Sequence, residues 1–129
     1  MKFSPFGINL YTFLKLPSAW WCGVRLVTIT PMVCEVKVRL KWFNQNPFKS
    51  MFWAVQGMAA ELATGILIMQ GAKSSQSKIS MLVINNKANF TKKAKGKLLF
   101  SCLPGDRIEK TFAALIETKE PQTLWLQAK

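Results

Sequence analysis

The stretch SMFWAVQGMAAELATGILIMQ, residues 50–70, decides the fold because it predicts one long helix. It is rich in alanine, leucine, methionine and isoleucine and contains no proline, a composition that favours helix over its whole length. At about 1.5 Å per residue this helix would be roughly 31 Å long. It is apolar on nearly every side, so we expect it to be buried all round, with a sheet wrapped around it. Its polar interruptions are Ser50, Gln56, Glu61, Thr64 and Gln70.

The residues before this helix predict a short amphipathic helix and a β-hairpin. Ser4 followed by Pro5 is typical of a helix N-cap and first turn. After an aromatic turn at Trp20 and Trp21, a run of β-branched residues and then a run of alternating apolar and charged residues indicate two paired strands. The predicted elements are a helix over Ser4–Leu16 and strands over Val24–Thr30 and Val33–Lys41, followed by a loop over Trp42–Lys49.

The residues after the long helix predict further strands and a surface helix. Asp106 and Glu109 have the spacing of a capping box, and Pro121 ends the helix that follows them. The predicted elements are a loop over Ala72–Lys78, a strand over Ile79–Phe90, a turn over Thr91–Lys97, a strand over Leu98–Leu103 and a last strand over Thr123–Ala128.

The size and charge of the chain limit its function. With 129 residues and 14.6 kDa, we expect residues 1–129 to form a single domain. The formal charge of +12 favours negatively charged partners, and the absence of histidine excludes Ser-His-Asp and Cys-His catalysis as well as imidazole metal sites. We therefore expect no metal, and catalysis by carboxylates, hydroxyls, amides or backbone dipoles.

The cysteines and the N-terminus predict a cytoplasmic protein. Cys22, Cys34 and Cys102 are an odd number without C-x-x-C spacing, which is typical of buried thiols in a reducing compartment. Polar residues interrupt the N-terminal apolar run and no signal-peptidase site follows, so we expect the mature chain to begin at Met1.

Glu61 is the most informative residue because it is a lone carboxylate in an otherwise apolar helix. A buried carboxylate is costly, so it is hydrogen-bonded, protonated or kept for a function. Its neighbours one turn away include Gly57 and Gly65, which leave room for a backbone or a narrow ligand. Pairing with a lysine or a strand amide is the structural alternative.

The order of these elements, together with Asn46-Pro-Phe-Lys-Ser50 and Ala59-Ala-Glu-Leu-Ala-Thr-Gly65, resembles the hotdog-fold acyl-CoA thioesterases, in particular their DUF4442 branch. The resemblance implies an α+β hotdog fold, in which an antiparallel sheet wraps a central helix and protomers form a dimer or a dimer of dimers. It implies that Glu61 is the catalytic carboxylate, acting at the dimer interface on a thioester whose CoA tail crosses the surface. Asn46 would place Glu61 or a water molecule.

The implied mechanism uses the carboxylate and the start of the helix. Glu61 would activate water or attack the thioester carbonyl, and backbone N–H groups near Phe52, Trp53 and Ala54 would stabilise the oxyanion. Thr64 would hold the water or the carboxylate, although a helix threonine often satisfies a backbone carbonyl instead. In many family members His-Gly-Gly stands where this sequence has Phe52-Trp53-Ala54. The family's closing C-terminal strands are expected to be short or missing here, so that the chain is truncated or a partner completes the sheet.

Lysines near the predicted turn are the candidate contacts for the CoA phosphates, with a solvated face as the alternative. They are Lys87, Lys92, Lys93, Lys95 and Lys97. The expected substrate is a thioester of CoA or of an acyl carrier protein, with no further cofactor. A non-catalytic protein that binds acyl-CoA or an acyl lipid is the competing function.

Nucleic acid and lipid membranes are two further partner classes that the positive charge raises. We expect no nucleic acid, because an aromatic pair within a basic strand is missing. We also expect no transmembrane segment, because Glu61 would cost roughly 2.5 to 3.5 kcal/mol within a span. A peripheral membrane contact through the Trp20-Trp21 turn and nearby basic residues stays open.

Overall fold

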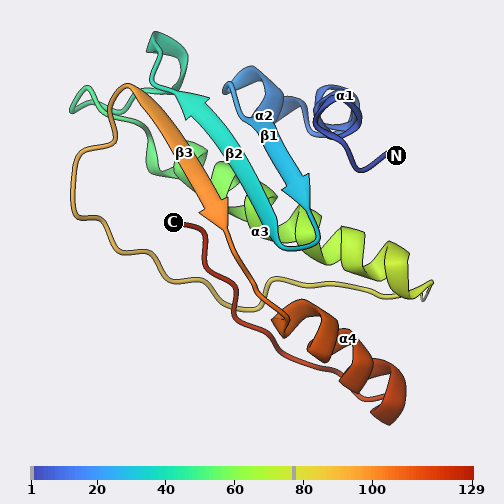
Figure 1. The fold of residues 1–129 in the computed structure, drawn as a ribbon. Helices are drawn as coiled ribbons and strands as arrows, with labels where there is room; N and C mark the ends of the chain where they lie inside the picture. The colour runs from blue at the N-terminus through green and yellow to red at the C-terminus, as the bar shows by residue number, and fades with distance from the viewer. Residues whose placement is uncertain (1, 77) are drawn as a thin grey trace.

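The computed structural model describes residues 2–76 and 78–129 and shows an antiparallel sheet packed on one long helix (Figure 1). The elements are α1 (Pro5–Lys15), α2 (Pro17–Trp21), β1 (Arg25–Thr30), β2 (Val33–Arg39), the 3-10 helix η1 (Trp42–Asn44), α3 (Trp53–Ser75), β3 (Lys97–Cys102) and α4 (Arg107–Thr118). β2 lies between β1 and β3, and both pairings are antiparallel. The predicted α+β arrangement with a long central helix is confirmed.

The N-terminal elements follow the prediction closely. The hydroxyl of Ser4 accepts a hydrogen bond of 3.1 Å from the backbone N–H of Gly7, so it caps α1 as expected. β1 and β2 form the predicted hairpin, with a register shift between Leu26 and Thr28. The predicted aromatic turn is wrong in detail, because Trp20 and Trp21 lie in the short helix α2, which Pro17 starts at a position that favours helix.

The core lies between the sheet and one face of α3. Cys34, Val36 and Val38 alternate along β2 and are all buried, as the period of two predicts. The buried residues of α3 recur every three or four positions and form one stripe: Val55, Ala59, Leu62, Ala63, Ile66 and Leu67. The expectation that α3 is buried all round is wrong, because three strands cover one side of the helix and Glu61 is exposed.

The boundaries of the long helix also differ from the prediction. α3 begins at Trp53 because Met51 forms an isolated antiparallel bridge with Gln45 and holds the preceding residues extended. It continues to Ser75, so residues 72–75 of the loop predicted over Ala72–Lys78 are helical, and it ends where Gln76 adopts a left-handed conformation with φ of 55°.

The predicted strand over Ile79–Phe90 is wrong. All of these residues are described, and they form an exposed coil that leads from the end of α3 to β3 (Figure 1). A strand is stable only when a neighbouring backbone completes its hydrogen bonds, and β3 pairs with β2 instead of with this segment. The predicted return strand is confirmed as β3, one residue earlier than expected.

α4 packs on the C-terminal part of α3, and a glycine allows the close approach. A Cβ atom on Gly71 would lie 2.7 Å from Cε2 of Phe112 and 3.0 Å from Cγ2 of Ile108, so an alanine does not fit without movement. The predicted capping box is wrong. Asp106 is the N-cap residue of α4, but its carboxylate forms an ion pair of 2.9 Å with Lys110, one turn along the helix.

The predicted last strand, Thr123–Ala128, is also wrong, because these residues form coil. The chain nevertheless returns to the sheet, and the C-terminus lies beside β3 in Figure 1. Lys129 and Ser101 exchange two backbone hydrogen bonds of 2.9 Å, on the side of β3 that faces away from β2. The C-terminal segment therefore pairs with β3 at Ser101 without forming a strand.

Candidate functional site

Glu61 lies on the face of α3 that points away from the sheet. The helical repeat places it opposite the buried stripe, and its side chain is exposed. It is the single acidic residue of α3. The Glu61 carboxylate of this chain is therefore in contact with solvent, and the costly burial expected from the sequence does not arise.

Apolar side chains border Glu61 at both ends. The ring of Trp53 lies over Gly57, with Cη2 3.8 Å from the position of a glycine-replacing Cβ. Trp53 also meets Phe90 edge to face, with ring centroids 5.4 Å apart. On the other side, Cε of Met81 lies 4.0 Å from the position of a Cβ on Gly65. The small neighbours of Glu61 are therefore flanked by an aromatic pair and a thioether.

The hydroxyl of Thr64 serves the helix backbone. It donates to the carbonyl oxygens of Ala60 and Glu61, each at 3.1 Å. This is the common behaviour of threonine inside a helix, which was the structural alternative for this residue.

Asn46 orders the turn that leads into α3. Its Oδ1 accepts hydrogen bonds from the backbone N–H groups of Phe48 and Ser50, at 2.9 and 3.1 Å. Its Nδ2 donates to the hydroxyl of Ser50 at 2.9 Å and to the carbonyl of Met51 at 3.3 Å. These contacts fix the chain just before the helix, so Asn46 positions the start of α3.

The start of α3 lies beside the lysine-rich segment. The backbone N–H of Met51 donates to the carbonyl of Ala94 at 2.8 Å, which anchors this segment at the beginning of the helix. No described side chain caps α3, and the N–H of Val55 donates to the carbonyl of Phe52 at 3.0 Å, which leaves the N–H groups of Trp53 and Ala54 without an acceptor within the helix. Positive charge from the lysines and the helix dipole therefore coincide at this end. The lysines of the segment, Lys92, Lys93 and Lys95, are all exposed, as are Lys87 earlier in the coil and Lys97 at the start of β3.

The start of α3 and Glu61 are well separated along one helix. Trp53 and Glu61 are eight positions apart, which corresponds to about 12 Å along the helix axis. The structure thus joins Asn46, the helix start and the lysines at one place, with Glu61 and Thr64 more than two turns further on. The contacts of Met81 with Gly65 and of Phe90 with Trp53 were missed, because the sequence pattern suggested that the segment of Met81 and Phe90 was a strand.

Comparison with known proteins establishes the family. The sequence model of DUF4442, a domain of unknown function, matches residues 9–120. The chain belongs to the DUF4442 family. None of the curated proteins matches this sequence.

Solved structures share the fold of this DUF4442 protein at low sequence identity. A protein of unknown function from Pseudomonas aeruginosa, proposed to be a thioesterase, is 19% identical with a TM-score of 0.73, covering 89% of this chain and 76% of that one. A protein of unknown function from Chlorobaculum tepidum is 14% identical with a TM-score of 0.73, covering 89% of this chain and 71% of that one. A proposed thioesterase from Shewanella oneidensis is 8% identical with a TM-score of 0.68, covering 83% and 77%. The hotdog-type fold is thereby confirmed.

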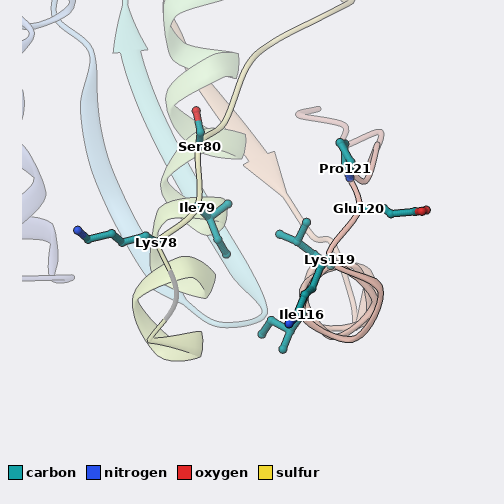
Figure 2. Close-up of a pocket in the computed structure, with 8 residues that line it drawn as sticks. Lys78, Ile79, Ser80, Ile116, Lys119, Glu120 and Pro121 are labelled. Atoms are coloured by element: carbon teal, nitrogen blue, oxygen red, sulfur yellow. The ribbon is translucent and has the colours of Figure 1, made fainter.

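A cavity of about 500 Å³ lies away from these site residues in the DUF4442 protein, between the coil after α3 and the end of α4 (Figure 2). Figure 2 shows Lys78 and Glu120 pointing away from this space, on opposite sides of it. The described lining contains none of the predicted site residues. It consists of Lys78, Ile79, Ser80, Leu115, Ile116, Lys119, Glu120 and Pro121.

A membrane crossing requires a helix that is both long and strongly apolar. Within residues 2–76 and 78–129 of the DUF4442 protein, no helix combines these two properties. This agrees with the expectation from Glu61 in the long helix.

Proposed function

We propose that this DUF4442 protein hydrolyses acyl thioesters of CoA or of an acyl carrier protein, with Glu61 as the working carboxylate. The observation that carries the proposal is the position of Glu61, which is exposed on the outward face of α3 and bordered by apolar side chains. Such a surface accepts an acyl chain next to a group that activates water or attacks a carbonyl. The thioesterase activity proposed for two of the structural relatives supports the same reaction class.

The start of α3 supplies the complementary chemistry. The N–H groups of Trp53 and Ala54 are suited to stabilise the oxyanion that forms when a thioester carbonyl is attacked. Lys92, Lys93 and Lys95 lie in the segment anchored there and are suited to bind the phosphates of CoA as point charges. Lys87 would extend this basic surface along the coil. Phe52 and Trp53 are about half exposed at the same place, so they would shape the entrance of the acyl chain.

The separation of these groups supports a homodimer or a dimer of dimers. A carbonyl held at the start of α3 is about 12 Å along the axis from Glu61 of the same helix, which exceeds the reach of a glutamate side chain. A second copy of the chain brings its own Glu61 to that carbonyl if two α3 helices lie side by side with their outward faces together. In this assembly Asn46 acts by holding the helix start, and Thr64 by supporting the helix that carries Glu61.

The deciding experiment measures thiol release from short, medium and long acyl-CoA thioesters by the wild type and by Glu61→Gln. Loss of a general base or nucleophile lowers kcat by about 10² to 10⁴. The matched control is Glu117→Gln, which makes the same change at an exposed helix position outside the site. Light scattering of each variant measures the mass of the assembly.

The outcomes separate the proposals. Turnover by the wild type and by Glu117→Gln, with its loss in Glu61→Gln, supports the assignment. Equal turnover by all three refutes the role of Glu61. A folded assembly without turnover that binds acyl-CoA in calorimetry favours the competing function, a non-catalytic binder of acyl-CoA or acyl lipid. A cytoplasmic location belongs to the same proposal and fits three free thiols.

A further inference from the structure

A row of aromatic rings lies at one end of the molecule, outside the site described above. Phe13 of α1 meets Trp20 of α2 edge to face at 5.2 Å between ring centroids. Trp21 stacks on Phe43 of η1 at 6.2 Å, and Trp42 meets Phe43 edge to face at the same distance. We call Phe13, Trp20, Trp21, Trp42 and Phe43 the aromatic ridge. α2 and the turn after β2 lie together at the end of the sheet where β1 begins and β2 ends (Figure 1).

The aromatic ridge is largely uncovered. Trp42 is 84% exposed and Trp21 is 67% exposed, which are high values for side chains that dominate cores and interfaces. α1 extends this apolar surface, because its outward face carries Phe6 and Leu10 in line with Phe13. Its opposite face holds the buried Ile8 and Thr12. The apolar side of α1 therefore remains available for a partner.

The charge around the ridge has one sign. Residues 1–34 contain no aspartate or glutamate, and Glu35 is the single acidic residue before Glu61. Lys15 lies in the last turn of α1, two positions after Phe13, and Lys41 lies directly before Trp42; both are exposed. Arg25 supports the ridge from within, since its guanidinium carbon lies 3.3 Å from the centre of the Trp20 ring. Four of the six acidic residues lie between positions 106 and 120, in or near α4.

We infer that the aromatic ridge docks this protein on an anionic lipid surface. Tryptophan prefers the boundary between headgroups and acyl chains, where its apolar ring is buried and its N–H stays near water. Lysines beside it bind the lipid phosphates and carboxylates while their stems lie along the apolar region. Aromatic side chains with a basic border thus match a bilayer that exposes negative charge.

The charge distribution favours a lipid surface over a second copy of the chain at this place. A symmetric dimer through the ridge would bring Lys15 and Lys41 of one copy close to the same residues of the other, with no acidic residue in this part of the sequence to compensate. Binding to an anionic bilayer is instead stabilised by the same lysines. The ridge is therefore suited to a partner that is both apolar and negative.

The test is co-sedimentation of the full chain with vesicles of pure phosphatidylcholine and of phosphatidylcholine with 30% phosphatidylserine. We expect the wild type to bind the anionic vesicles more tightly. Trp21→Ala combined with Trp42→Ala should weaken this binding about tenfold or more, because two largely exposed rings that would enter the lipid are lost. Lys15→Gln combined with Lys41→Gln should weaken it roughly 30-fold on anionic vesicles, at about fivefold per lysine. Trp125→Ala, which removes another tryptophan that is more than half exposed, near the C-terminus, is the control and should bind like the wild type.

Three results would overturn the inference. They are a wild type that does not bind anionic vesicles, a Trp125→Ala variant that loses as much binding as the ridge variant, and an assembly that falls apart in light scattering when the ridge tryptophans are removed. Circular dichroism is used to check that each variant is folded. The readout is binding, so the result does not depend on thioester hydrolysis and is distinguishable from a failure of the proposed function.

Discussion

Replacing Gly71 by alanine should destabilise the protein, although the same change in a free helix is favourable. Alanine gains about 1 kcal/mol over glycine in a helix interior. At Gly71, however, the new Cβ would stand 2.7 Å from Cε2 of Phe112, whereas carbon atoms in contact normally lie about 3.5 to 4.0 Å apart. α4 must then move outward by roughly 1 Å, and overpacking of this kind costs about 1 to 3 kcal/mol. Since Phe112 and Ile108 are both buried, part of their burial is lost as well. We expect a net loss of about 1 to 2 kcal/mol.

The matched control is Gly65→Ala in the same helix. The nearest atom to its Cβ would be Cε of Met81 at 4.0 Å, an ordinary contact, so this variant should gain about 0.5 to 1 kcal/mol. Urea denaturation measures both free energies of unfolding. Combining Gly71→Ala with Phe112→Leu should restore part of the loss, because the shorter side chain makes room. Equal stabilisation by Gly71→Ala and Gly65→Ala would refute the reasoning from the α3–α4 contact.

The remaining predictions concern two buried groups. Asn44→Ala should lower the free energy of unfolding, measured in urea, by about 2 to 3 kcal/mol, because the buried side chain of Asn44 forms hydrogen bonds with the backbone of Lys41, Cys22 and Arg39. The control Asn89→Ala, in the exposed coil, should change this free energy by less than about 0.5 kcal/mol. Equal effects of the two substitutions would contradict the prediction. Burial, then the neighbouring Cys102 and Glu35, raise the pKa of Cys34 to about 12, so iodoacetamide should modify Cys22 well before Cys34 in the folded protein. Because the unfolded chain loses this proton near pH 8.5, the free energy of unfolding should fall as the pH rises from about 9 to about 12, and a flat profile would show that the thiol is not shielded.

The parts of the fold that were predicted from sequence have local causes. α1 follows from Ser4 and Pro5, which start a helix whatever lies around it, and the hairpin follows from the alternation along β2. The coil at 79–90 was not predictable in this way. Its apolar residues have strand propensity, but a strand needs a partner, and which segment pairs with β2 depends on contacts far away in the sequence. The capping box predicted at Asp106 is wrong for a local reason instead, because Lys110, one turn along α4, pairs with the carboxylate of Asp106.

The candidate site shows the same division. The helical repeat correctly predicted that Glu61 shares one face with Gly57 and Gly65, since this depends only on helix geometry. It did not predict that Glu61 is exposed, because the number of strands that cover the helix is not a property of the helix sequence. The helical repeat also did not predict that Met81 lies against the helix at Gly65, because this contact depends on the path of the coil.

The pairing of β2 with β3 has a consequence for how the protein is made. Arg39 of β2 faces Lys97 of β3, 58 positions later in the chain, whereas β1 and β2 are joined by a short turn. At about 5 to 20 residues per second, a ribosome finishes the hairpin roughly 3 to 12 s before it completes the start of β3. During this interval one side of β2 presents backbone groups without their final partner, so nascent chains close together on one messenger are at risk of pairing with each other.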